Sequence, residues 1–184
     1  VSPRRDPGRR GGLALSVGGS PRPMEGMNAI QESAWDYPRP PRVEESSETV
    51  EVVFGGVLIA RTTLSWRVLE TSHPPTYYLP RDAFVGDVLV PVAGRHTVCE
   101  WKGRADYFDV AAGGRVADAA AWTYPEPTPS FEVIRGAIAV MPGAMERCVV
   151  DGETVVPQAG GFYGGWITSR VAGPFKGEPG TWGW

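Results

Sequence analysis

The amino-acid sequence predicts a mainly β protein with antiparallel strands and one short helix. Glycine (24 residues) and proline (18 residues) occur together at about twice their usual share. Because both residue types interrupt long helices, this content favours short strands and tight turns. The β-branched and aromatic runs are short, and several are separated by Gly-Gly or Asp-Gly pairs, which are typical of hairpins.

Nine strands are expected along the chain from these runs. In order, they cover residues 50–54, 57–64, 67–71, 76–79, 88–92, 105–111, 115–122, 147–150 and 154–156. Three pairs are predicted hairpins because Gly55-Gly56, Gly113-Gly114 and Asp151-Gly152 lie between their strands.

The one helix is predicted near residues 130–141. Ser130 is the expected N-cap, and Pro142-Gly143 is the expected stop. Apolar residues recur between these limits at spacings of three and four, which indicates one buried helical face.

The first 26 residues differ from the rest in charge. They contain five arginines against Asp6 and Glu25, a balance of +3, and the sequence starts with Val1 where an initiator methionine is usual. We expect residues 1–26 to be a disordered extension or the product of a misassigned start, with a genuine basic tail as the alternative. Residues 27–184 are expected to form a single domain.

Charge and composition exclude several partners. A net charge of −3 and a pI near 5.5 are too acidic for a dedicated nucleic-acid binder. No apolar run approaches the ~20 residues that cross a membrane. Two cysteines make no disulfide framework, and free thiols are typical of a cytoplasmic protein. We therefore expect a cytoplasmic monomer or dimer without a cofactor, whose partner is an unknown small molecule.

Several strings together resemble one bacterial and fungal family. They are WDYPRPPRVE at 35–44, RVLETSHPPTYYLP at 67–80, HTVCEWKGRADYF at 96–108, AAWTYPEP at 120–127, and GGFYGGW and GPFKGEPGTWGW near the end. The chain resembles the domain of unknown function family 427 over about residues 33–184. The resemblance implies a β-tent-like fold, in which two small antiparallel sheets are pinned together, as in Yippee proteins and the cereblon ligand-binding domain. It implies no established activity.

Two activities linked to this fold or family are poorly matched. A nucleotidyltransferase needs paired metal-binding carboxylates, and the chain has no Asp-x-Asp motif. β-Tent relatives often hold zinc between two Cys-x-x-Cys knuckles, whereas this chain offers only four scattered ligands. A zinc site would need all of them to converge: His73, His96, Cys99 and Cys148. We predict no metal site, and packing of the seven tryptophans is the expected alternative for joining the sheets.

The densest group of polar residues predicts a pocket with catalytic potential. His96 and Cys99 are three residues apart, and we expect the imidazole to approach the thiol. The expected roles are general acid or base for His96 or Glu70, nucleophile for Cys99 and anion contact for Lys102. The alternatives are an ion pair between Glu70 and an arginine, a buried apolar role for Cys99 and a surface position for Lys102.

Aromatic residues are expected to line the same pocket, although most of the rings in the chain are expected to be core. The predicted ligand-binding residues are Arg67, Tyr77, Tyr78, Trp101, Tyr107, Trp122, Tyr163 and Trp166.

Two functions from different classes follow. The first is small-molecule binding in this pocket, and whether a reaction accompanies it is left open. The alternative is a non-enzymatic interaction module that uses the aromatic, glycine-rich C-terminal segment as an exposed platform.

Overall fold

The computed structural model describes residues 30–181, 183 and 184. The prediction for residues 1–26 lies outside this part of the chain. Within it, the mainly β, antiparallel fold class is confirmed, although the strands form more sheets than the two expected.

One four-stranded antiparallel sheet has the order β12-β11-β3-β4. Its strands are β3 (Val50–Phe54), β4 (Val57–Thr62), β11 (Arg147–Val150) and β12 (Glu153–Thr154). Residues alternate between buried and half-buried along β3, so one face of the sheet points into the core. Gly55 and Gly56 join β3 to β4 with φ of 60° and 75°, the left-handed conformation that a two-residue hairpin turn requires.

The other four-stranded antiparallel sheet has the order β10-β9-β8-β7. Its strands are β7 (Leu89–Cys99), β8 (Gly103–Ala112), β9 (Arg115–Pro127) and β10 (Ile138–Val140). Strand β7 extends well beyond the predicted 88–92, because its pairing with β8 resumes at His96 after an irregularity. It forms the edge of the sheet and is mostly exposed.

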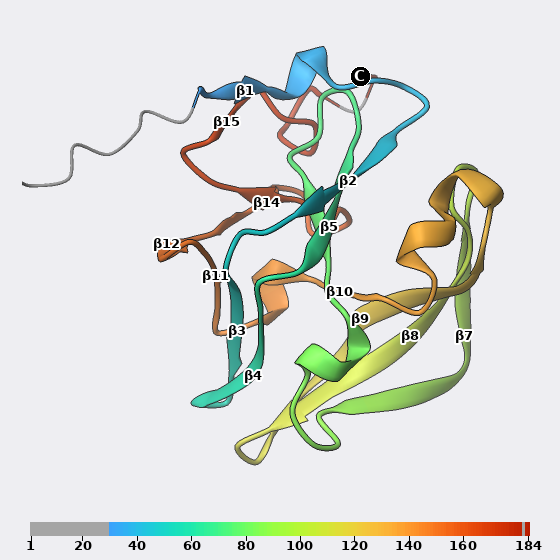
Figure 1. Ribbon diagram of the computed structural model, residues 1–184, viewed down its shortest axis with the longest axis vertical. Helices are drawn as coiled ribbons and strands as arrows, with labels where there is room; N and C mark the ends of the chain where they lie inside the picture. The colour runs from blue at the N-terminus through green and yellow to red at the C-terminus, as the bar shows by residue number, and fades with distance from the viewer. Residues whose placement is uncertain (1–29, 182) are drawn as a thin grey trace, which may run out of the picture.

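These two sheets contribute to one main hydrophobic core. Figure 1 shows β3, β4 and β11 on the left and β7, β8 and β9 on the right. Buried residues of both sheets meet in this core, among them Val52, Ile59, Val110, Val140 and Val150. Packing between the two sheets therefore holds the larger part of the fold together.

A third sheet lies between the first part of the described chain and β10, the strand that pairs with β9. It has the order β2-β5-β6, with strands β2 (Arg42–Ser46), β5 (Ser65–Leu69) and β6 (Thr76–Tyr78). Leu79 and Ile138 exchange two backbone hydrogen bonds of 2.8 Å, which attach the end of β6 to β10. A second cluster of buried residues lies here, including Val68, Tyr78 and Tyr124.

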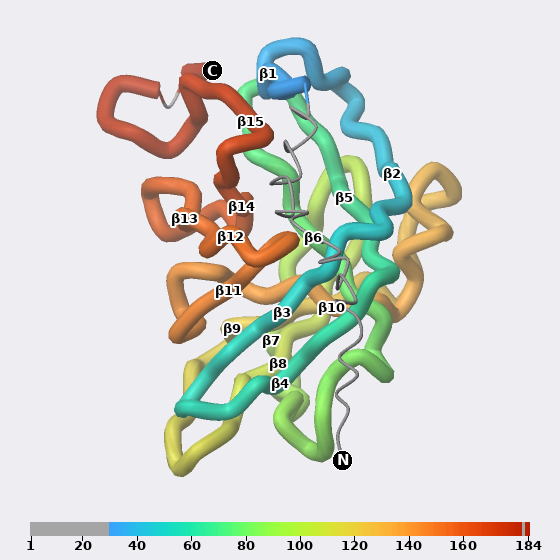
Figure 2. Tube along the Cα trace, turned by 60° about the vertical axis from the view of Figure 1, so that its left-hand side comes forward, coloured from blue at the N-terminus to red at the C-terminus, as the bar shows by residue number. Residues whose placement is uncertain are grey.

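The remaining elements are short. Strands β1 (Glu32–Ser33) and β15 (Val171–Ala172) pair in parallel, and β13 (Val156–Pro157) pairs with β14 (Trp166–Ile167). Figure 2 shows β15 beside β1, so the C-terminal segment returns to the beginning of the described chain. The 3-10 helices are η1 (Ala34–Asp36), η2 (Arg81–Ala83), η3 (Pro129–Ile134) and η4 (Pro142–Ala144).

The helix expected near 130–141 is shorter than predicted. Only its first half is helical, as η3, and the chain turns at Gly136 with a φ of 71°. Ile138–Val140 then form β10, whose three residues are all buried. A short continuous apolar run is compatible both with a buried helical segment and with a buried strand, so the apolar spacing does not distinguish between them.

In the part of the chain that the structure describes, no helix has the length and apolar character needed to span a membrane.

Candidate functional site

A pocket with a volume of about 540 Å³ opens between the third sheet, the β7–β8 turn and the C-terminal segment. Strands β5 and β6 contribute Val68 and Tyr78, and β9 contributes Trp122 and Tyr124. The β7–β8 turn adds residues 99–102, and the C-terminal segment adds residues 162–164 together with Lys176. Segments that are far apart in the sequence therefore build one site.

The β7–β8 turn is held in place by Thr128. The Thr128 backbone N–H donates to the carbonyl of Lys102 at 3.2 Å, and its hydroxyl donates to the carbonyl of Trp101. Gly103 follows with a φ of 96°, which favours glycine because it has no Cβ. These contacts place the Lys102 side chain at the pocket wall.

Aromatic side chains surround the Lys102 ammonium. Its Nζ lies 5.8 Å from the ring centroid of Tyr124 and 5.9 Å from that of Phe131. Burial by itself lowers the pKa of Lys102, but the neighbouring Tyr78, Cys99 and Glu70 side chains outweigh it and raise the pKa above its usual value. Lys102 therefore carries its proton at neutral pH.

Two tyrosines beside Lys102 are kept neutral. Burial is the main cause that raises the pKa values of both Tyr78 and Tyr124, and Tyr78 is only 1% exposed. The Trp122 indole N–H donates to the Tyr78 hydroxyl at 3.3 Å, and the two rings meet edge to face. Trp122 is thereby held as one wall of the pocket.

The pocket lining also includes an ion pair and a histidine. Arg39 and Glu70 pair at 3.0 Å, as the alternative interpretation of Glu70 expected. His73 donates from Nδ1 to the Thr71 carbonyl at 2.9 Å. Burial lowers the pKa of His73, and the nearby Lys176 and Arg39 charges act in the same direction.

Lys176 reaches the pocket from the C-terminal segment. Its backbone N–H donates to the Ser72 carbonyl at 2.8 Å, and its carbonyl accepts from Gln158 at 2.7 Å. Its Nζ donates to the Trp184 carbonyl at 2.6 Å. The chain contains only two lysines, and both line this pocket.

Comparison with known proteins identifies the family. The profile described as a domain of unknown function, DUF427, matches residues 42–151, which is more than half of the chain. This chain belongs to the DUF427 family. No curated protein matches the sequence. The matched region includes the β7–β8 turn, whereas the C-terminal segment that completes the pocket of this DUF427 chain lies beyond it.

Eight of the twelve residues predicted as catalytic or ligand-binding line the pocket. They are Glu70, Tyr78, Cys99, Trp101, Lys102, Tyr107, Trp122 and Tyr163. Whether they act on a ligand stays a prediction.

The expected approach of His96 to Cys99 is wrong. Both residues lie on β7, where an odd spacing places two side chains on opposite faces of the strand. Cys99 is half-buried and lines the pocket, whereas His96 is exposed and is not among the lining residues. The His96 imidazole therefore points away from the strand face that carries Cys99.

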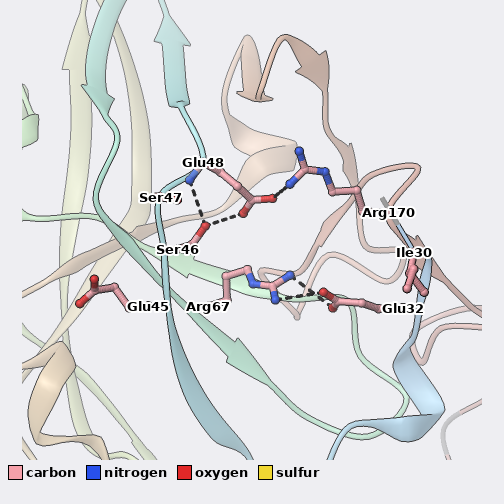
Figure 3. A pocket seen from close by; sticks show the side chains of 8 residues that line it. All are labelled: Ile30, Glu32, Glu45, Ser46, Ser47, Glu48, Arg67 and Arg170. Carbon is pink, nitrogen blue, oxygen red and sulfur yellow. Dashed lines mark hydrogen bonds and ion pairs between the residues drawn. The ribbon is translucent and has the colours of Figure 1, made fainter. Parts of the chain in front are cut away.

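Arg67 belongs to a different pocket from the one predicted. It is 12% exposed and pairs with Glu32 at 3.1 Å and Glu44 at 2.9 Å. Figure 3 shows this smaller pocket of about 280 Å³, where a second arginine, Arg170, pairs with Glu48. Because its arginines and most of its carboxylates neutralise one another, this network has mainly a structural role.

Tyr77 and Trp166 are core residues and do not line the main pocket. Trp166 is fully buried, and its ring centroid lies 5.0 Å from that of Tyr77. The Tyr77 hydroxyl donates to Glu48 at 2.7 Å on the far side of the core. Strand alternation separates Tyr77 from the pocket residue Tyr78.

The four scattered zinc ligands do not come together. Cys148 is buried in the main core on β11, and His96 is exposed on β7. Only His73 and Cys99 share a pocket. Among the described residues, no group of three or more potential metal ligands is present.

Some pocket residues were missed as site residues. Lys176, Gln158 and Arg39 reach the pocket through loops, and no periodic pattern marks them. The chain contains only two lysines, and this rarity is a signal that could have pointed to Lys176.

Proposed function

We propose that this DUF427 domain binds a small organic molecule in the pocket that Lys102 lines. The observation that supports the proposal is the pocket itself, with about 540 Å³ of space, aromatic walls and a few polar groups. Sites for small molecules usually have a volume of about 300–1,000 Å³ and a similar mixture of apolar and polar lining.

Within this proposal Lys102 acts as a contact and not as a nucleophile. A lysine that forms a Schiff base is activated by a lowered pKa. Lys102 has a raised pKa instead, because its neighbours outweigh the effect of burial. Its ammonium is therefore suited to hold a ligand in place.

Cys99 provides a direct probe of occupancy. It lines the pocket and is half-buried, whereas Cys148 is buried in the core. A ligand in the pocket is expected to slow the reaction of Cys99 with iodoacetamide. The rate of this reaction is measured by intact mass spectrometry. A free small thiol in the same mixture is the control for loss of reagent. If no compound in a panel of small aromatic acids, amides and alcohols slows labelling or raises the melting temperature, the proposal is refuted.

The interaction-module alternative draws less support from the C-terminal segment. Trp166, one of its aromatic residues, is fully buried in the core, whereas Phe162 is 76% exposed at the pocket. The segment therefore contributes both to the core and to the wall of the pocket, and less of it is free to serve as a platform.

A further inference from the structure

Lys102 forms no ion pair with a carboxylate of the described residues, although Glu70 acts on it from a longer distance. All nine ion pairs among the described residues involve arginine, and no carboxylate lies within 4.0 Å of the Lys102 nitrogen. Two aromatic rings occupy the space beside it, at 5.8 and 5.9 Å from their centroids. Lys102 is half-buried, and an anion beside a partly desolvated ammonium offsets part of the cost of removing it from water.

The other cations of the pocket are already engaged. Arg39 pairs with Glu70 at 3.0 Å, and the Lys176 ammonium donates to the Trp184 carbonyl at 2.6 Å. Glu70 thus forms its ion pair with Arg39, and it acts on Lys102 only from beyond 4.0 Å. Lys102 forms no ion pair among the described residues, and with three N–H donors and Cys99 as its hydrogen-bonding neighbour it has donors to offer an incoming group.

The surroundings of Lys102 favour a particular ligand shape. Trp122 is held by its hydrogen bond to Tyr78, and Gly164 packs directly against the Trp122 ring. Trp101 and Tyr107 are further half-buried aromatic residues of the lining. Fixed rings of this kind accept a flat apolar body with little loss of side-chain freedom.

We propose that the ligand of this pocket is a small organic anion, whose carboxylate or phosphate pairs with the Lys102 ammonium and whose flat apolar body packs against Trp122. This inference rests on the proposed pocket function and adds the chemical class of the ligand. The carboxylate and the phosphate share the same recognition, since both present oxygens to a cation at the end of an apolar slot.

The test compares matched probes at pH 7.5 on the full chain. 2-Naphthoate, 2-naphthyl phosphate and the uncharged 2-naphthamide have the same ring system and differ in the head group. Binding is measured by calorimetry and by the protection of Cys99 from alkylation. At least one of the two anions is expected to bind tenfold or more tightly than the amide, since a charge-assisted hydrogen bond contributes more than a neutral one. The anion that binds more tightly identifies the head group.

Variants then assign the preference to Lys102. Lys102→Met is expected to reduce the preference for the anion to less than threefold, and Lys102→Arg to retain most of it. Arg61→Met is the matched control, because Arg61 is 65% exposed on β4 and does not line the pocket. It is expected to leave the preference unchanged.

The outcomes separate the two proposals. If the amide binds as tightly as both anions, the anion inference is overturned and the pocket function stands. If Lys102→Met keeps the full preference, the assignment to Lys102 is likewise overturned. If none of the three probes binds the wild-type chain or protects Cys99, the result counts against both proposals. The comparison of probes on the wild-type chain does not depend on the folding of any variant.

Discussion

Gly164 allows the chain to pass directly behind Trp122, and its substitution by alanine tests how tightly this wall of the pocket is built. The glycine is buried and does not adopt a left-handed conformation, so alanine is compatible with its backbone. A Cβ at this position would lie 3.0 Å from Cζ2 of Trp122 and closer still to Cη2. Carbon atoms in contact are normally about 3.5–4.0 Å apart. The indole must therefore move by roughly 1 Å to restore normal contacts.

The ring has little freedom to move, because its N–H donates to the buried Tyr78 hydroxyl at 3.3 Å. Overpacking of this kind costs about 1–3 kcal/mol. Alanine also restricts the unfolded chain more than glycine does, and this effect stabilises the folded protein by about 0.4–1 kcal/mol. We therefore expect Gly164→Ala to lower the free energy of unfolding by about 1–2 kcal/mol, which corresponds to a fall in melting temperature of roughly 2–8 °C.

Differential scanning calorimetry of the two alanine variants Gly164→Ala and Gly143→Ala provides the measurement. At Gly143 the added Cβ meets two side-chain carbons of Pro157, at 3.6 and 3.9 Å, which are ordinary contacts. This control variant is expected to be as stable as the wild type or slightly more stable. If Gly164→Ala melts within 1 °C of Gly143→Ala, Trp122 is free to move and the account of a fixed wall is refuted.

Three further predictions concern charged and reactive groups. Burial lowers the pKa of His73, so the unfolded chain takes up this proton first and the wild type loses stability as the pH falls below about 6.5. In urea unfolding between pH 7.5 and 5, the free energy of unfolding of His73→Gln should fall less steeply with decreasing pH than that of the wild type. An equally steep fall contradicts the assignment of this pH dependence to His73. Cys99 should react with iodoacetamide in the folded chain, whereas Cys148, whose pKa burial raises to about 12, should react only after denaturation. Native labelling of both thiols, measured by peptide mass spectrometry, would count against the core position of Cys148. Arg67→Met removes the arginine partner of Glu32 and one of the two arginines that pair with Glu44, and a loss of about 1 kcal/mol in chemical unfolding is expected. A variant as stable as the wild type would show that the network contributes nothing.

The hairpins could be predicted because their signals are local. Gly55-Gly56 and Asp151-Gly152 adopt the left-handed conformations that the turns need, and the strands on either side pair as expected. The second half of the predicted helix could not be assigned, because residues 138–140 are apolar without interruption. Their pairing with β9, a long-range contact, made them a strand.

Among the side chains of the pocket, too, some could be predicted from the sequence and others could not. Glu70, Cys99 and Lys102 were predicted from the densest group of polar residues in the sequence, and all three line the pocket. His96 was misplaced because its spacing from Cys99 was considered without the alternation of an extended strand. Lys176 enters the pocket only because its backbone bonds to Ser72, which is 104 positions away in the sequence.

The sequence by itself determined the fold class, the hairpins and the family, since turn chemistry and the order of apolar residues are local properties of the chain. Only the tertiary structure decided which polar residues share a pocket. It brought Lys102 beside Tyr124 and Phe131 and placed Glu70 in the same pocket, where Glu70 forms its ion pair with Arg39. Whether a charge has a counterion depends on distances between segments that are remote in sequence, and those distances are set when the sheets pack together.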